Sequence, residues 1–322
     1  AQAAGVDIVG AGSPVKGQSG LLAAGLGCAA LDDLRSTLAT ADADLVWLAS
    51  AGDFGAGGEQ DDSRAVAAAT GRNIKIASLE PIPQSALDLQ SGGWLTGLPR
   101  PADSLRFLGL PRLSRSFREA AEALLAFGPP RMLIIDTWSL REEGSLAARL
   151  LGAIDLTLSL MGEPETIDAA FVGPMTGTGL HALPGETFQG LHGDLWAGLR
   201  FANGACASIG ASNVAGRWNT TATLLSGQGR LRIYDDGFEW IGPDGTRHDQ
   251  LRIRKEERGE PASASHSVAA LADGLRRLLD DTVPDSGPVS MEAILTIGQA
   301  ALLSARTAQP ESPATIRRMM TR

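Results

Sequence analysis

The chain of 322 residues has few of the side chains on which metal sites and disulfide frameworks are built. It contains two cysteines and four histidines. Cys28 and Cys206 lie far apart in the sequence, so two unpaired core thiols in a reducing compartment are expected rather than a disulfide. No two histidines have the spacing of a metal-binding pair, so a zinc site is not expected.

Positive charge is also scarce. The sequence has 28 lysines and arginines against 37 acidic residues, a net charge of −9, and no basic patch of the kind that nucleic-acid binding requires. No apolar run reaches the length of a membrane span. We therefore expect a cytoplasmic protein with no nucleic-acid or membrane partner. The first residues are Ala1-Gln2 without a methionine, which leaves open a segment removed or left out upstream.

The length favours about two domains. In residues 1–100, strand-like apolar runs alternate with helical segments; the runs are 6–11, 45–49 and 74–77, and the helical segments are 21–26, 32–40 and 63–70. The run at 45–49, LVWLA, has no polar alternation, as is typical of a parallel strand covered on both faces. This order predicts a Rossmann-like, doubly wound parallel sheet.

Residues 101–322 have a different pattern. Ser116 and Glu119 form a potential capping box for a helix at 116–127, and further helices are expected at 145–161, 267–279 and 291–307. Strand-like segments lie at 131–138, 167–172, 195–201, 205–212, 220–225, 231–234 and 238–241. Asn-Gly and Asp-Gly pairs between several of them are typical of hairpin turns. We predict an α+β domain with a large open, mainly antiparallel sheet, whose C-terminal helices could pack back on the first domain.

The stretch IKIASLEPIP, residues 74–83, lies where the two patterns meet. It reads as a buried strand that runs into a turn fixed by Pro81 and Pro83. The seam between two domains is the default place for a ligand-binding cleft, so chemistry is expected here.

Several segments together resemble the Gfo/Idh/MocA oxidoreductases, the family of glucose–fructose oxidoreductase and inositol dehydrogenase. They are ADADLVWLAS (41–50), IKIASLEPIP (74–83), GSLAARLLGAIDLTLSLMGEPETIDA (144–169), LWAGLRFANGACASIGAS (195–212), LLSGQGRLRIY (224–234) and ALLSARTAQP (301–310). The resemblance implies an NAD(P)-dependent oxidoreductase acting on a sugar, cyclitol or related polyol or keto compound. It also implies hydride transfer between nicotinamide and a carbinol carbon, and a homodimer or homotetramer joined through the open sheet.

The glycines of Gly10–Gly12 resemble a dinucleotide-binding turn, but the spacing to the strand at 45–49 favours another register. We expect one helix in that interval, so residues 6–14 are interpreted as the family's second strand and the first β-α unit is expected upstream. In this register Ser13 takes the place of the family's ribose-binding acid. With Lys16 it could accept the extra phosphate of NADP, which is slightly favoured over NAD; an ordinary Ser-Pro turn is the alternative.

The same alignment gives the remaining candidate residues. Ala49 and Ser50, at a strand end, and Pro81 are expected to lie against the cofactor, although small residues at a strand end could equally serve packing. The family's catalytic lysine aligns with Glu80. Asp155 matches a family acid that is often structural. Glu80 and Asp155 are the candidate catalytic groups, and a capping or surface role for Glu80 and a packing role for Asp155 are the alternatives.

The family's catalytic aspartate and histidine align with Ala148 and Gly152, and neither of these can move a proton. His181 or His192, which flank a Gly- and Pro-rich segment, could replace the lost histidine. Because lysine, aspartate and histidine are all missing, a second hypothesis stays open. It is a catalytically degenerate relative that serves as a binding, regulatory or partner subunit.

Overall fold

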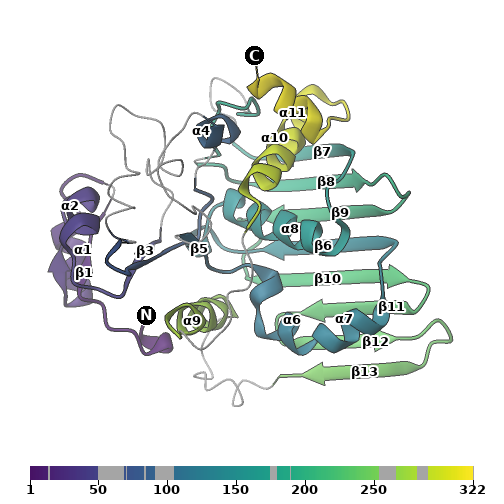
Figure 1. The fold of residues 1–322 in the computed structure, drawn as a ribbon, viewed down its shortest axis with the longest axis horizontal. Coiled ribbons are helices and arrows are strands. Elements are labelled where there is room, and N and C mark those ends of the chain that lie inside the picture. The colour runs from purple at the N-terminus through teal and green to yellow at the C-terminus, as the bar shows by residue number, and fades with distance from the viewer. Residues whose placement is uncertain are drawn as a thin grey trace.

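The computed structural model describes residues 1–13, 15–49, 69, 71–82, 85–90, 105–174, 180–188, 190–253, 266–280 and 289–321. An N-terminal part with parallel strands packs against a C-terminal part built on an eight-stranded sheet (Figure 1). The two fold classes predicted from the sequence are confirmed.

The N-terminal part contains two small parallel sheets. After the 3₁₀ helix η1 (Gln2–Ala4), the elements are β1 (Gly10–Ala11), α1 (Ser19–Leu26), β2 (Ala29–Ala30), α2 (Leu34–Thr40), β3 (Leu45–Leu48), β4 (Lys75–Ser78), α4 (Ala86–Gln90) and β5 (Leu105–Phe107). β1 pairs with β2, and β3, β4 and β5 form the second sheet in that order. Because every pair is parallel, the carboxyl ends of the strands within each sheet point the same way.

The expectation of a single helix between Gly12 and β3 is wrong. The interval holds α1, β2 and α2, and they fit because α1 has 8 residues, α2 has 7 and β2 has only two. Gly10–Gly12 therefore lies at a strand-to-helix turn that is followed by a second parallel strand. A Cβ on Gly12 would lie 2.5 Å from the carbonyl oxygen of Leu31, so the turn can pack against the end of β2 only with glycine there.

The C-terminal sheet has the order β13-β12-β11-β10-β6-β9-β8-β7. All of its neighbouring strands are antiparallel except β6 and β9, which run parallel. The strands are β6 (Met132–Trp138), β7 (Thr166–Val172), β8 (Asp194–Arg200), β9 (Cys206–Ser212), β10 (Asn219–Ser226), β11 (Gly229–Tyr234), β12 (Gly237–Ile241) and β13 (Arg247–Arg252). The predicted strands are confirmed, and the edge strand β13 was missed.

The helical elements of this part are η2 (Pro111–Leu113), α6 (Arg115–Glu119), α7 (Ala121–Phe127), η3 (Arg141–Glu143), α8 (Leu146–Met161), α9 (His266–Leu279), α10 (Met291–Thr307) and α11 (Pro313–Met320). The capping box predicted at Ser116 is wrong. Ser114 is the N-cap and accepts a hydrogen bond from the Phe117 N–H, and the helix divides at Ala120 into α6 and α7.

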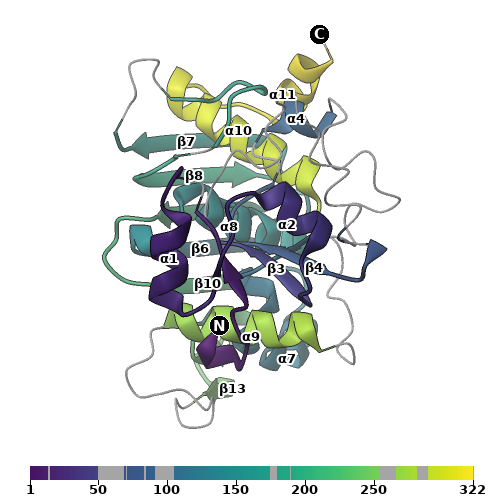
Figure 2. The ribbon, with the colours of Figure 1, turned by 90° about the vertical axis from the view of Figure 1, so that its left-hand side faces the viewer.

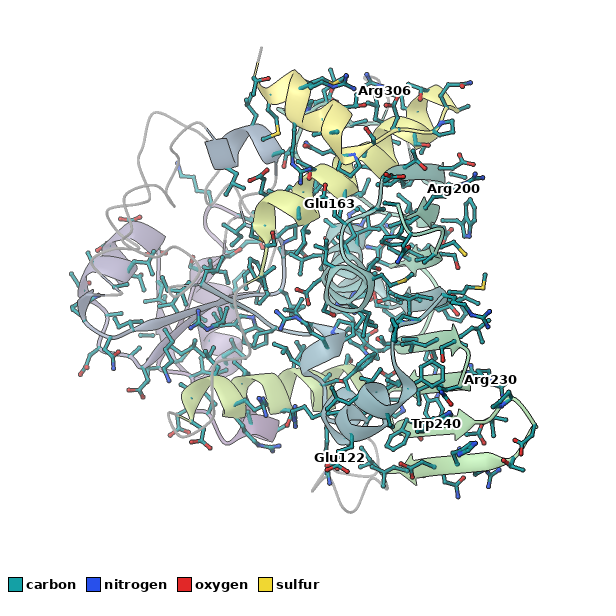
Figure 3. All side chains as sticks on the ribbon, turned by 45° about the vertical axis from the view of Figure 1, so that its right-hand side comes forward. Glu122, Glu163, Arg200, Arg230, Trp240 and Arg306 are labelled. Atoms are coloured by element: carbon teal, nitrogen blue, oxygen red, sulfur yellow. The ribbon has the colours of Figure 1, made fainter. Side chains whose placement is uncertain are left out.

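Helices cover one face of the large sheet (Figure 1). α8 packs on β6 and β9, and α10 packs on β7, so these helices lie between the sheet and the N-terminal part (Figure 2). Leu133 and Ile135 of β6 are fully buried on this side. No described helix covers the other face, from which Arg200 and Arg230 project (Figure 3). The main core is therefore one layer of apolar side chains between sheet and helices.

Helix α9 joins the two parts of the molecule. Leu275 is buried in a second apolar cluster with Ala77 of β4 and with Leu108, which follows β5. At the C-terminal end of α9, the Lys75 ammonium donates to the Leu278 carbonyl at 2.7 Å. These contacts hold the parallel strands at a fixed place relative to the large sheet.

Cys28 and Cys206 are free thiols and are half-buried rather than in the core. No helix within the described ranges is long and apolar enough to cross a bilayer. Among the same residues, no three His, Cys, Asp or Glu side chains gather in a way that could hold a metal ion.

Candidate functional site

The carboxyl ends of β3, β4 and β5 face the start of α8. The Leu79 N–H donates to the carbonyl of Leu48 at 3.4 Å, and the Leu108 N–H donates to the carbonyl of Ser78 at 2.8 Å, so the three strand ends are held together. In open α/β sheets, ligands bind outside the carboxyl ends of the strands. The residues that follow β4, beginning with Leu79 and Glu80, are therefore the first to consider.

Glu80 is 3% exposed and caps the start of α8. Its carboxylate accepts hydrogen bonds from the Ser145 N–H, at 3.0 Å, and from the Ser145 hydroxyl. Ser145 is the N-cap of α8, and its Oγ accepts from the Ala148 N–H at 3.1 Å. A negative charge is favourable at a helix N-terminus. This contact is the capping role given above as an alternative for Glu80; its catalytic role stays a prediction.

Arg149, in the first turn of α8, is 4% exposed. Its guanidinium lies over the ring of Trp218, 4.0 Å from the centroid, and its Nε has no hydrogen-bond partner. Burial lowers the pKa of Arg149 to about 10, while the negative charges of Glu80, Glu143 and Asp235 act in the opposite direction. Sequence reasoning gave Arg149 no role. The signal that could have found it is a lone cation in the apolar stretch LAARLLGAI.

His192 and Asn213 lie near Gly144, the residue before the N-cap of α8. Asn213 is fully buried; its Oδ1 accepts from the Gly193 N–H at 3.0 Å, and its Nδ2 donates to the Gly144 carbonyl at 3.3 Å. Nδ2 also lies 2.9 Å from Nδ1 of His192. An amide NH₂ can only donate, so Nδ1 of His192 is the acceptor and the proton of the neutral ring is on Nε2. His192 is half-buried.

Gly144 connects these groups. A Cβ built on it would lie 3.5 Å from Nη2 of Arg149, and its own carbonyl accepts from Asn213. We call the side chains of Glu80, Ser145, Arg149, His192 and Asn213 the α8-start cluster. It combines a carboxylate, a hydroxyl, a guanidinium, an imidazole and an amide around one turn of backbone.

The two positions that align with the family's aspartate and histidine lie on the same helix, but neither has a side chain that can transfer a proton. Ala148 and Gly152 are both buried. A Cβ on Gly152 would lie 3.0 Å from Cδ of Pro111 in η2, so the proline ring fills the space that a larger side chain would need. The sequence left His192 as one possible replacement for the histidine, and it is the only one of the two suggested that belongs to the α8-start cluster.

Asp155 is not part of this cluster. It lies ten residues along α8 from Ser145, which corresponds to about 15 Å of helix. Its Oδ2 is 2.5 Å from Nε of Arg112, and the side chain is 5% exposed. Burial raises the pKa of Asp155, and the ion pair with Arg112 acts against this. The contact fixes η2 against α8, which is a packing role.

Ser13 and Lys16 lie in the turn between β1 and α1. The Ser13 N–H donates to Oγ of Ser19 at 3.2 Å, and Ser13 Oγ accepts from the Val15 N–H at 3.1 Å. Both hydrogen bonds are local to this part of the chain, and Lys16 is exposed. Ser13 does not lie at the end of the second strand, because that strand is β2. The register that placed Ser13 at the end of the second strand is therefore not the one observed, and contact of Ser13 and Lys16 with a cofactor stays a prediction.

The residues that do follow β2 are acidic. Asp33 accepts a hydrogen bond from the Ser36 N–H at 3.2 Å and so caps α2, whereas Asp32 is exposed. Sequence reasoning missed Asp32 because it placed the second strand at 6–14. The signal was present, since a dinucleotide fold has an acid about 20 residues after its glycine turn.

The other predicted cofactor contacts have different outcomes. Ala49 is exposed just after β3, and Ser50 lies outside the described residues. Pro81 is buried next to Glu80. Their contact with a cofactor stays a prediction.

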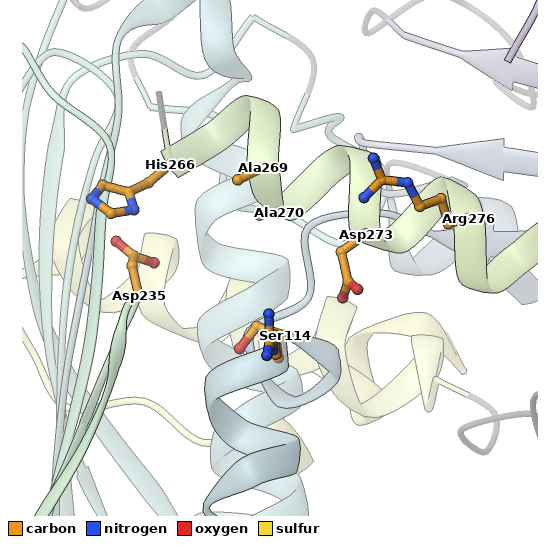
Figure 4. Close-up of a pocket in the computed structure, with 8 residues that line it drawn as sticks. Ser114, Asp235, His266, Ala269, Ala270, Asp273 and Arg276 are labelled. Carbon is orange, nitrogen blue, oxygen red and sulfur yellow. The ribbon is translucent and has the colours of Figure 1, made fainter. Parts of the chain in front are cut away.

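A hollow of about 140 Å³ lies beside α9 and is also lined by Ser114 and Arg115 at the start of α6. Asp235 and His266 point toward one another at its edge (Figure 4). Asp235 accepts from the Thr220 N–H at 2.9 Å and from Nε1 of Trp218 at 3.4 Å, and burial raises its pKa. Trp218 thus contacts both Arg149 and the acid at this hollow.

Comparison with known proteins gives matches in structure only. No family model matches the sequence, and no curated protein matches it. Among solved structures, an NAD binding oxidoreductase from Klebsiella pneumoniae superposes with a TM-score of 0.66 at 13% identity, covering 95% of this chain and 89% of that one. A myo-inositol dehydrogenase from Corynebacterium glutamicum gives 0.62 at 14% identity, covering 95% and 91%.

A third structure, the WlbA dehydrogenase from Bordetella pertussis in complex with NADH and UDP-GlcNAcA, gives a TM-score of 0.58 at 14% identity and covers 95% and 90% of the two chains. The chain therefore has the fold of two-domain dehydrogenases, with a Rossmann-like part and a large open sheet. This is the fold of the Gfo/Idh/MocA dehydrogenases, as predicted from the sequence.

Because Ser145 also donates to Glu80, we expect the loss of this helix cap to destabilise the protein more than the loss of an ordinary cap. Replacing Ser145 by alanine removes the cap, worth about 0.5–2 kcal/mol, and takes a donor from a buried carboxylate, worth about 1–3 kcal/mol. Ser312→Ala is the matched control, because Ser312 caps α11 with the same bond, from the Thr315 N–H at 3.1 Å, without a buried acid. Urea unfolding should show a larger loss for Ser145→Ala. Equal losses would mean that Glu80 does not depend on this serine.

The position of Pro111 predicts that the family's histidine cannot be restored alone. Gly152→His must displace the proline ring and should destabilise the protein by about 1–3 kcal/mol through overpacking. Gly25→His in α1 is the control, because nothing lies within 4 Å of its Cβ position. Thermal unfolding should show a lower Tm for the first variant only. A Gly152→His protein as stable as the control would contradict the packing described here.

Proposed function

We propose that this protein is an NAD-dependent oxidoreductase that acts on a polyhydroxylated compound such as a sugar, a cyclitol or a related keto compound. The observation that carries the proposal is the coincidence of the dehydrogenase fold with a polar cluster at the carboxyl ends of β3, β4 and β5. The structural neighbours include inositol and sugar-nucleotide dehydrogenases, which supports this class of substrate.

The residues around the first strand fit a dinucleotide. Gly10 and Gly12 leave the backbone of the β1–α1 turn without side chains, and no side chain caps the N-terminus of α1. Free helix N–H groups at such a turn favour the pyrophosphate of a dinucleotide. When bound, NAD supplies a nicotinamide that accepts or donates a hydride, and this chain's residues hold it and position the substrate.

We favour NAD over NADP. The preference for NADP rested on Ser13 and Lys16 at the end of the second strand, and that register is not the one observed. Asp32 follows β2 instead, with an exposed carboxylate. A carboxylate at this position accepts hydrogen bonds from the ribose hydroxyls of NAD and repels the 2′-phosphate of NADP.

We assign stabilisation of the alkoxide that forms during hydride transfer to His192. Asn213 fixes the ring with its proton on Nε2, and Nδ1 is occupied as an acceptor. The Nε2–H can hydrogen-bond the carbonyl oxygen of the substrate and stabilise the alkoxide that forms as the hydride arrives, and the alkoxide then takes its proton from water. In the reverse direction water accepts the hydroxyl proton, and the same N–H stabilises the alkoxide from which the hydride leaves. Glu80 serves this group indirectly, because it holds the start of α8 and with it Gly144.

The degenerate subunit considered from the sequence remains the second candidate. It is motivated by Pro111, which occupies the space beside Gly152. A protein that binds NADH but oxidises or reduces no polyol would favour it. Assembly through the helix-free face of the large sheet, as a homodimer or homotetramer, and a cytoplasmic location are part of either proposal.

Cofactor choice tests the assignment of Asp32. Asp32→Ser should raise the affinity for NADPH relative to NADH by roughly tenfold, since it removes one like-charge contact. Asp7→Ser removes an equally exposed acid before β1 and should leave the ratio unchanged. Fluorescence titration of both nucleotides measures this. If wild-type protein binds neither nucleotide, the oxidoreductase proposal fails; if it already prefers NADPH, the assignment of Asp32 fails.

Turnover tests the role of His192. A panel of inositols, sugars and sugar acids is incubated with protein and NAD, and NADH formation is followed. On any compound that reacts, His192→Gln should lower kcat by about 10²–10³-fold, the usual cost of losing one donor to a developing oxyanion. NADH binding should not change. His248→Gln, in the edge strand β13, is the matched control. Full activity of His192→Gln would contradict the role assigned to His192.

A further inference from the structure

Arg149 differs from three arginines that form ion pairs in this part of the fold. Arg112, Arg118 and Arg317 each contact a carboxylate, of Asp155, Asp273 and Glu163 respectively. Arg149 is more buried than any of these, yet within the described residues its side chain forms no ion pair, and its buried Nε has no hydrogen-bond partner. A buried charge without a partner is strongly unfavourable, so such a group is expected to have a partner when the protein works.

The acids near Arg149 do not fill this role, because each is engaged elsewhere. Glu80 accepts both donors of Ser145. Glu143 accepts from the Leu140 N–H at 3.0 Å and from the Ser267 hydroxyl at 2.5 Å. Asp235 accepts from Thr220 and Trp218. They provide a negative environment that keeps Arg149 charged, but none forms the two-pronged contact that a guanidinium can make.

The position of the guanidinium is restricted by a buried ring. Its Cζ lies 4.0 Å from the ring centroid of Trp218, which is 4% exposed. Nη2 lies toward Gly144, which has φ of +130° and no side chain to cover it. A planar guanidinium held in this way matches a planar carboxylate, which it can bind through two parallel hydrogen bonds.

We propose that Arg149 binds the carboxylate of the substrate, and that the polyhydroxylated substrate is therefore a sugar acid. This rests on the proposed function and specifies its substrate class. A carboxylate held at Arg149 lies near Gly144, whose carbonyl accepts from Asn213, and Asn213 in turn contacts His192. The hydroxyl or keto carbon that reacts at His192 thus belongs to the same small molecule as the carboxylate.

The surroundings favour a singly charged anion. Glu80, Glu143 and Asp235 all act on Arg149 electrostatically, and a dianionic phosphate would meet their repulsion as well as the attraction of the single cation. A sugar phosphate is therefore the less favoured ligand, and its binding is an outcome that the experiment must separate from that of a sugar acid.

The test compares pairs of ligands that differ by a carboxylate in place of a hydroxymethyl group. Glucuronate is paired with glucose, and gluconate with sorbitol, in calorimetric titrations of the full chain with and without NADH; inorganic phosphate and glucose 6-phosphate form the third arm. The acids should bind at least tenfold more tightly than their neutral partners. Arg149→Gln should lower the affinity for the acids about 10- to 100-fold, the usual worth of a hydrogen bond to a charged group. Affinity for the neutral compounds should not change.

Arg149→Lys separates charge from geometry. It keeps the cation but loses the two-pronged contact, so its affinity for the acids should lie between those of the wild type and Arg149→Gln. Arg306→Gln is the matched control, since Arg306 is a half-exposed arginine of α10 paired with Glu186. NADH affinity should be the same in all four proteins, so a loss of the acid site can be told from a failure of the dinucleotide proposal.

Three results would overturn the proposal. They are equal binding of acids and neutral compounds by the wild type, unchanged acid binding by Arg149→Gln, and tighter binding of glucose 6-phosphate than of glucuronate. If Arg149→Gln does not fold, the wild-type comparison and the lysine variant still decide between these outcomes.

Discussion

The hydrogen bonds between Glu80 and Ser145 join the end of a parallel strand to the start of the longest helix on the large sheet. This contact is buried, and in it a carboxylate from one part of the molecule accepts hydrogen bonds from the other part. The carboxylate accepts two hydrogen bonds from Ser145, the N-cap of α8, and so holds the backbone at Gly144 and Ser145 in place. Arg149 and Asn213, which lie next to this backbone, are positioned with it. The site owes its geometry to a capping interaction rather than to the residue types that the family uses.

The charges at this point are exchanged relative to the family pattern. The resemblance implied a lysine at the strand end and an aspartate on the helix; here Glu80 is at the strand end and Arg149 is on the helix, next to Ala148. This chain also has one cation and one carboxylate here, but the carboxylate is at the strand end and the cation is on the helix. The cation is now buried and stacked on Trp218, where burial lowers its pKa. Losing a lysine therefore does not mean that the site has lost its positive charge, and this argues against a site that has simply decayed.

Much of the fold could be predicted from the sequence, because long buried strands carry strong signals. The runs at 45–49 and 74–77 and the strands of the large sheet follow from apolar patterning and hairpin glycines. The element that was missed here is short: β2 has two residues, too few for any periodicity, and its omission shifted the register that placed Ser13. The strand predicted at 6–11 is also shorter than expected, since β1 has two residues. Arg149 and Asn213 could not be assigned because their roles depend on contacts between distant segments. Only packing shows that Pro111 fills the space beside Gly152.

The most direct test of this account is transfer of a labelled hydride. The protein is incubated with NADH deuterated at the transferable position of nicotinamide, together with keto forms of sugar acids and of neutral sugars, and the products are examined by mass spectrometry. The account predicts that one deuterium appears on the carbinol carbon of a sugar acid, with little or none in the neutral compounds. Bound NADH with no deuterium transferred to any of them would contradict it and would leave a dehydrogenase fold used for binding alone.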